Sequence, residues 1–157
     1  MNNINYFMEQ ALKLAVDNIQ TGAGGPFGAV IVKANQIIAQ GQNQVIANHD
    51  PTAHAEMVAI RQACAVLGQF QLENCVVYSS CEPCPMCLGA LYWARVAKVY
   101  YANTRHQAAA IGFDDAFIYE QIIQAPLKRS IPFIHIPLHQ AQLVFEQWQA
   151  KADKTLY

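Results

Sequence analysis

Two short segments of the chain carry the residue types that bind transition metals. Cys84 and Cys87 are three positions apart in segment 83–87, whose two prolines favour the start of a helix. Residues at that spacing lie on one face of a helix, so both thiolates can reach the same metal ion. His54, at another predicted helix start, would be a third ligand. Two thiolates and one imidazole suit Zn²⁺, and three protein ligands leave a fourth position open for water, as in catalytic sites.

Glu56 lies two residues beyond His54 and is predicted to carry protons rather than to bind the metal. On a helix this spacing turns the two side chains about 200° apart, so the pair is a poor clamp for one ion. In the first turn of a helix, however, both side chains can reach the space above the helix end. Together the two segments match the pattern H-x-E…P-C-x-x-C, which is typical of zinc-dependent nucleobase deaminases.

The segments that must position these residues alternate between helices and strands. We expect a helix over 6–19, strands over 27–32 and 36–39 joined by a hairpin turn, and a helix from Asp50, as its N-cap, to Leu67. The remaining predicted elements are strands over 75–79, 96–102 and 131–136, and helices over 88–94, 113–124 and 138–151. This order predicts an α/β fold, a three-layer α/β/α sandwich with a mixed sheet of about five strands.

Composition indicates one globular domain over residues 1–157. Hydrophobic residues make up 54% of the 157 residues and charged residues 13%, which excludes a disordered chain and favours a buried subunit interface. The formal net charge of -1 argues against a nucleic-acid partner bound through a basic face. We expect no membrane partner and a cytoplasmic location, because no segment has the length of a membrane span and the N-terminal residues lack signal-peptide features. Three of the five cysteines crowd into 81–87, as expected of a metal site in a reducing compartment.

Two alternatives use the same residues without catalysis. Cys81 could be a fourth ligand and make the zinc site structural, and the chain could then be a zinc-stabilised binding module. Cys81 lies at a predicted strand end, and Pro83 and Pro85 redirect the chain before Cys84, which argues against a fourth ligand. Glu56 argues against the binding module, since a structural site has no use for a carboxylate beside an open metal position. Cys64 and Cys75 are most simply small buried apolar residues.

The chain resembles the cytidine-deaminase superfamily along essentially its whole length, and within it the short bacterial guanine deaminases. The resemblance is carried by segments 24–30, 50–56, 79–90, 92–95 and 112–115 and by the C-terminal Tyr157. The Gly-Phe-Asp-Asp segment at 112–115 and the terminal aromatic residue are the parts that favour guanine.

The resemblance implies hydrolytic deamination of guanine to xanthine and ammonia, with one Zn²⁺ per chain. It implies that Glu56 moves the protons and that Asp115 contacts the substrate or assists proton transfer. It also implies a homodimer whose C-terminal tail, about 147–157, crosses to the partner. The further residues that it places at the substrate are Phe27, Asn43, Ala55, Trp93 and Tyr157.

Other substrates remain open from the sequence. The tRNA adenosine deaminases share the His-Ala-Glu and Pro-Cys-x-x-Cys elements, but they grip a polyanion, and this chain has no basic surplus and no basic tail. Deamination of cytosine or another amino-substituted ring depends on the size of the pocket. Without the resemblance, Asn43 would be read as a turn residue, Phe27 and Trp93 as packing residues, and one of Asp114 and Asp115 as a helix cap.

Overall fold

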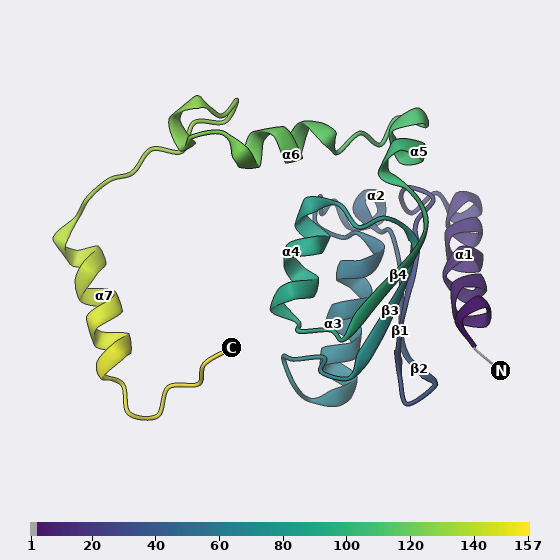
Figure 1. Ribbon diagram of the computed structural model, residues 1–157, viewed down its shortest axis with the longest axis horizontal. Helices are drawn as coiled ribbons and strands as arrows, with labels where there is room; N and C mark the ends of the chain where they lie inside the picture. The colour runs from purple at the N-terminus through teal and green to yellow at the C-terminus, as the bar shows by residue number, and fades with distance from the viewer. Residues whose placement is uncertain (1–2) are drawn as a thin grey trace. The chain divides into compact units, whose positions relative to one another are not determined.

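A four-stranded mixed sheet is the centre of the first of two units. The computed structural model describes residues 3–157, which divide after Ala116 into these units. The strand order is β2-β1-β3-β4; β1 is antiparallel to both of its neighbours, and β3 is parallel to β4 (Figure 1). The strands are β1 (Gly28–Lys33), β2 (Gln36–Gln42), β3 (Cys75–Cys81) and β4 (Lys98–Asn103).

Helices cover both faces of this sheet, which confirms the predicted three-layer α/β/α arrangement. α1 lies on one face, and α3 and α4 lie on the other (Figure 1). The helices of the first unit are α1 (Ile4–Thr21), α2 (Val45–Asn48), α3 (Ala55–Leu67), α4 (Pro85–Trp93) and α5 (Arg105–Ala110). α6 (Ala116–Ile123) begins at the boundary, and the second unit continues with a 3₁₀ turn (Pro126–Lys128) and α7 (His139–Ala150).

The core of the first unit has one layer on each face of the sheet. Phe7 and Ala11 of α1 pack with Val30, Val32 and Tyr78 on one face. On the other face, three alanines of α3 pack against the strands and against Leu72 and Leu91; they are Ala55, Ala59 and Ala63. Because both faces are covered, β1 is an almost unbroken apolar run rather than an alternating one.

Glycines in the sheet let the helices approach closely at one end. A Cβ atom on Gly41 would lie 2.0 Å from the backbone oxygen of Ala55, the first residue of α3. A Cβ atom on Gly28 would lie 2.3 Å from the backbone oxygen of Ala11 in α1. Residue 41 is therefore glycine because α3 begins directly against the backbone of β2.

The helix starts and the strand ends that matter for function lie at the same end of the sheet. Gly28 pairs with Gln42, Ala29 with Ser79, and Cys81 with Asn103, so β1 begins where the other three strands end. α3 and α4 both begin at this end. In sheets of this kind, ligand sites lie at the carboxyl ends of the parallel strands.

Two expectations from the sequence are wrong. Residues 131–136 form no strand, so the sheet has four strands among the described residues; that apolar segment has no partner strand within its unit, and a strand needs one. The third helix begins at Ala55 and not after Asp50, because Asp50 opens a turn: its backbone oxygen accepts from the Ala53 amide. The two short helices of this unit, α2 and α5, were not predicted from the sequence.

The predicted hairpin between β1 and β2 is confirmed. Ala34 and Asn35 both have positive φ, 49° and 60°, as the two central residues of a type I′ turn require. Over residues 3–157, no helix is both long enough and apolar enough to cross a membrane.

Candidate metal centre

His54 is held at the start of α3 by the turn that precedes it. The Asp50 carboxylate accepts hydrogen bonds from the Thr52 hydroxyl (2.7 Å) and the Thr52 amide (2.8 Å), and these bonds lower the pKa of Asp50. The His54 amide donates to the Thr52 backbone oxygen at 2.8 Å, and the Gln44 amide donates to the Ala53 oxygen at 2.8 Å. The loop is thus tied both to itself and to the segment that follows β2. His54 is the extended N-cap residue from which α3 begins.

Cys84 and Cys87 are placed by the start of α4. Cys84 is the N-cap residue, with extended backbone, and Pro85 follows as the first helical residue, where its missing N–H leaves no bond unmade. Cys87 lies in the first turn and is fully buried. The start of a helix favours a thiolate over a thiol, because the unpaired backbone N–H groups carry partial positive charge.

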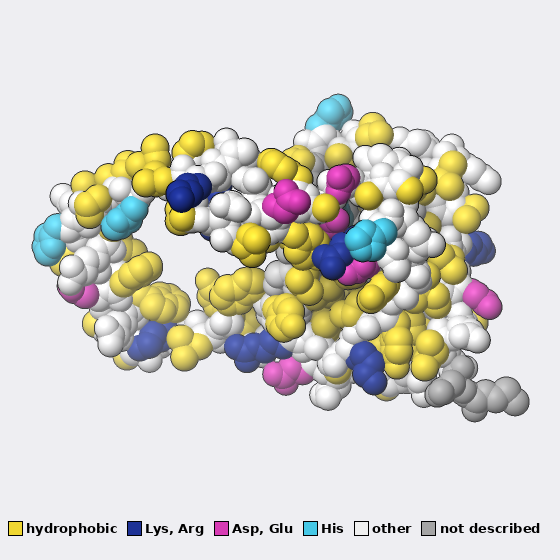
Figure 2. All heavy atoms as spheres, turned by 45° about the horizontal axis from the view of Figure 1, so that its top comes forward, with side chains coloured by type: hydrophobic (Ala, Val, Ile, Leu, Met, Phe, Trp, Pro, Cys, Tyr) yellow, Lys and Arg dark blue, Asp and Glu magenta, His cyan; other side chains and the backbone are white. Residues whose placement is uncertain are grey.

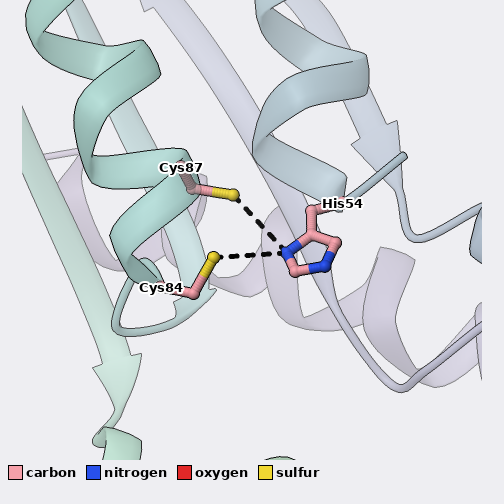
Figure 3. A group of neighbouring side chains, drawn as sticks. All are labelled: His54, Cys84 and Cys87. Atoms are coloured by element: carbon pink, nitrogen blue, oxygen red, sulfur yellow. Dashed lines mark hydrogen bonds between the residues drawn. The ribbon is translucent and has the colours of Figure 1, made fainter. Parts of the chain in front are cut away.

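The three side chains converge on one point (Figure 3). His54 Nδ1 lies 3.5 Å from Cys84 Sγ and 3.6 Å from Cys87 Sγ, and the three ligand atoms all lie within 4.8 Å of one another. A tetrahedral zinc ion, with bonds of about 2.3 Å to sulfur and about 2.05 Å to nitrogen, places such atoms about 3.5 Å apart. The donor set and its spacing therefore fit zinc.

The thiols of the cluster differ in acidity. Hydrogen bonds, from Cys87 first and then from His54, lower the pKa of Cys84 to about 4. Donation to that thiolate raises the pKa of Cys87, as does burial, and the same thiolate raises the pKa of His54. Because cysteine binds a metal as the thiolate, binding of a divalent cation favours the deprotonated form of both cysteines.

Glu56 lies beside the cluster, as the spacing predicts. The side chain is 6% exposed; its Oε1 accepts from the Ser79 hydroxyl at 3.1 Å and its Oε2 accepts from the Cys87 thiol at 3.5 Å. Burial raises the pKa of this carboxyl, which makes it a better proton acceptor than an exposed glutamate. Ser79 was not predicted from the sequence, although it is one of two consecutive serines near the end of an apolar strand.

Cys81 does not join the cluster. Among the described residues, the group of histidine, cysteine and acidic side chains with metal-binding spacing consists of His54, Cys84 and Cys87. The Cys81 thiol points instead to the Thr104 backbone oxygen, at 3.8 Å, and burial raises its pKa to about 11. The four-ligand structural site is therefore disfavoured. Cys75 is fully buried, as expected from the sequence, whereas Cys64 is only half-buried.

Several residues expected at the substrate lie around the same end of the sheet. Asn43 is buried directly after β2, and Ala55 is the fully buried first residue of α3. Phe27, directly before β1, packs edge-to-face on Phe113 with ring centres 4.9 Å apart.

The remaining expected residues have different positions. Asp114 Oδ1 accepts from the Ala116 amide at 2.9 Å and so caps α6. Asp115 is half-buried; burial raises its pKa, and the Cys84 thiolate adds to this, which places Asp115 within electrostatic reach of the cluster. Trp93 ends α4, roughly 13 Å along the helix axis from Cys84 at about 1.5 Å per residue, and is 67% exposed. Tyr157 belongs to the second unit.

Residues 1–103 match the family model described as the cytidine and deoxycytidylate deaminase zinc-binding region. The chain belongs to this family of zinc-binding deaminases, which confirms the resemblance noted in its sequence. Within the family it is similar to the guanine deaminase of Bacillus subtilis, with 52% identity over 155 residues that cover 99% of each chain. The crystal structure of guanine deaminase from that species matches with a TM-score of 0.97 and 52% identity, covering 100% of this chain and 99% of that one.

Two further relatives differ in what they act on or bind. The tRNA-specific adenosine deaminase of Aquifex aeolicus is 33% identical over 146 residues, 93% of each chain. The crystal structure of a mutant of the protein NE0047 in complex with 8-azaguanine is 34% identical to this chain, with a TM-score of 0.67. The match covers 69% of this chain and 63% of that one.

We predict that Cys84→Ala and Cys87→Ala each abolish stoichiometric zinc binding, because each removes one of three ligands. Cys81→Ser is the matched control, since Cys81 is a nearby buried cysteine outside the cluster. Zinc per chain, measured by atomic emission on the purified proteins, should be near one for the wild type and Cys81→Ser. Loss of zinc from Cys81→Ser would instead support a four-ligand structural site.

Proposed function

We propose that this protein catalyses the zinc-dependent hydrolysis of guanine to xanthine and ammonia. The observation that carries the proposal is the full-length similarity to the guanine deaminase of Bacillus subtilis. The contacts of Glu56 support it, because a buried carboxylate beside a three-ligand metal cluster serves proton transfer and has no structural purpose.

The zinc ion and Glu56 would have different roles in the reaction. When bound, the zinc ion supplies Lewis-acid activation of the water molecule that is consumed. Glu56 accepts one proton from this water and delivers it to the ring nitrogen next to the carbon at which the new C–O bond forms. The second proton of the water then passes through Glu56 to the amino group, and the C–N bond breaks with release of ammonia. The Ser79 hydroxyl holds Oε1 of the carboxylate. Cys87 has no proton to donate once it is a metal ligand, so Oε2 is then available for transfer.

The purine would be held by the residues around this end of the sheet. We assign base contacts to Phe27, Asn43, Ala55 and Asp115, which border the cluster or its loops. Asp115 would contact the substrate or assist proton transfer. In this proposal Trp93 and Tyr157 reach the pocket from other parts of the assembly, since Trp93 lies at the far end of α4 in its own chain.

Deamination of adenosine in tRNA is the second candidate, supported by the similarity to the Aquifex aeolicus enzyme. Against it stands the net charge of -1, because proteins that grip RNA neutralise several phosphates with lysine and arginine. We therefore rank guanine first and propose that nucleic acid is not a partner. We also propose a cytoplasmic location, since five free thiols, two of them in a zinc site, suit a reducing compartment.

The substrate proposal predicts a particular outcome in a panel of guanine, guanosine, adenine, cytosine, cytidine and tRNA. Ammonia release should be largest with guanine, and its rate should change little between low and moderate salt, because the substrate is neutral. Inosine formation in tRNA without turnover of guanine would reverse the ranking.

The proton-transfer role predicts that Glu56→Gln keeps zinc and the folded state but lowers kcat by about 10²–10⁴-fold, the range typical of general acid–base groups. The amide is similar in size and can accept from Ser79, but it cannot cycle a proton. Glu73→Gln is the control, since it makes the same chemical change at an exposed position. Near wild-type turnover by zinc-loaded Glu56→Gln protein would contradict the role.

We propose that the protein is a homodimer in which residues 117–157 pack on a second copy. Much of the surface of this segment is hydrophobic (Figure 2). Its exposed apolar side chains include Ile123 (81%), Leu127 (71%), Ile131 (73%), Ile134 (71%) and Phe145 (78%). So many exposed apolar groups are unusual for a monomer and typical of an interaction surface. The tail of about 147–157, with Tyr157, would then complete the site of the partner.

The tail proposal predicts that deletion of residues 154–157 leaves zinc content and thermal unfolding nearly unchanged. The deletion should lower kcat/KM for guanine by about 10²-fold, because a residue that orders the substrate is lost.

Light scattering of the wild type should give the mass of a dimer. A monomer, or a truncated protein with unaltered kcat/KM, would contradict the proposal.

A further inference from the structure

Asn18 is a polar residue in the buried stripe of α1. It follows Ala11 and Ala15 on the same helix face and has 0% of its surface exposed. A buried amide without hydrogen bonds is costly, so a residue of this kind is stable only where its bonds are made. The physical role of Asn18 therefore depends on what it binds.

Both hydrogen-bonding ends of the Asn18 side chain are occupied. Its Nδ2 donates to the backbone oxygen of Gly25 at 2.7 Å and to that of Asn43 at 2.9 Å, while its Oδ1 accepts from the Thr21 hydroxyl at 3.2 Å. Gly25 precedes β1 and Asn43 follows β2. One buried amide thus joins the two loops that flank the hairpin.

The same network fixes the direction of the Asn43 side chain. Asn43 Oδ1 accepts from the Gly25 amide at 3.3 Å and from the Val45 amide at 3.2 Å. The oxygen end of the amide is therefore used by the backbone, and the NH₂ end is the one left to donate. Gly24 leaves room for this arrangement, since a Cβ atom at that position would lie 2.1 Å from Asn43 Oδ1.

We infer that Asn18 is a positioning residue for base recognition: it locks the Gly25 and Asn43 loops so that Asn43 presents an N–H donor to an acceptor atom of the purine. The inference rests on the proposed function, in which Asn43 binds the base. Asn18 itself is fully buried and does not touch the substrate. It acts through the two backbone oxygens that it holds.

A double-mutant cycle tests this inference. The variants are Asn18→Leu, which is similar in size but has no donor, Asn43→Ala, and the two together. Asn18→Ser is a milder replacement that retains one donor and serves if Asn18→Leu does not fold. Leu72→Ala is the control for lost stability, because Leu72 is fully buried and its amide bonds to Ala94, at the C-terminal end of α4.

We expect Asn18→Leu to keep zinc and to lower kcat/KM for guanine about 10–100-fold, mainly through KM, as a misplaced binding group does. The double variant should be no worse than Asn43→Ala alone, within about twofold, because residues that act as one unit are not additive. Leu72→Ala should lose thermal stability without this change in KM. Asn18→Ser should fall between the wild type and Asn18→Leu.

Additive losses in the double variant would overturn the inference, and so would an equal rise in KM for Leu72→Ala at an equal loss of stability. The proposed function is judged separately by the wild type. If the wild type does not deaminate guanine, the cycle is run on the base of the panel that it does deaminate, and the same two outcomes decide the role of Asn18.

Discussion

Three ligand atoms from two helices must meet within the span of two metal bonds, and the rest of the first unit is arranged around that requirement. His54 and Cys84 are 30 residues apart, yet each is the N-cap residue of a helix that begins at the same end of the sheet. His54 and Cys84 both have extended backbone, so the side chain of each projects from the start of its helix. The convergence is set by how α3 and α4 dock on β1, β2 and β3.

The same convergence concentrates charge where a reaction needs it. Two helix starts favour a thiolate, and the thiolate at Cys84 in turn raises the pKa values of His54 and Cys87. The Glu56 carboxylate is held close to these groups, because it is buried and each of its oxygens accepts a hydrogen bond. Metal ligands must be deprotonated, so the protonation of this site is linked to cation binding.

The chemistry of the site could be predicted from the sequence because it depends on local spacing. Two cysteines three apart at a helix start, and a glutamate two after a histidine, have positions that the helix geometry determines. Ser79 and Asn18 could not be assigned in this way, since their partners are 23 and 25 residues distant and only the assembled sheet brings them together.

The errors in the predicted elements have the same origin. Residues 131–136 have the composition of a strand but no neighbour to pair with in their unit, and composition says nothing about neighbours. Asp50 and Pro51 have the composition of a helix start, but the Asp50 carboxylate binds Thr52 and holds a turn. The prediction that Asp114 or Asp115 caps the following helix is confirmed, since Asp114 accepts from the Ala116 amide. This contact spans two residues, so it could be predicted from the local sequence.

Gly41 sets a limit on how this chain can vary. A helical glycine such as Gly89 has nothing within 4 Å of the place where a side chain would begin, so many residues would be tolerated there. At position 41 even a methyl group would meet the backbone of Ala55, one residue from His54. Any substitution must therefore displace the helix that presents a metal ligand. Natural selection should hold position 41 as firmly as the ligands, although glycine has no chemistry of its own.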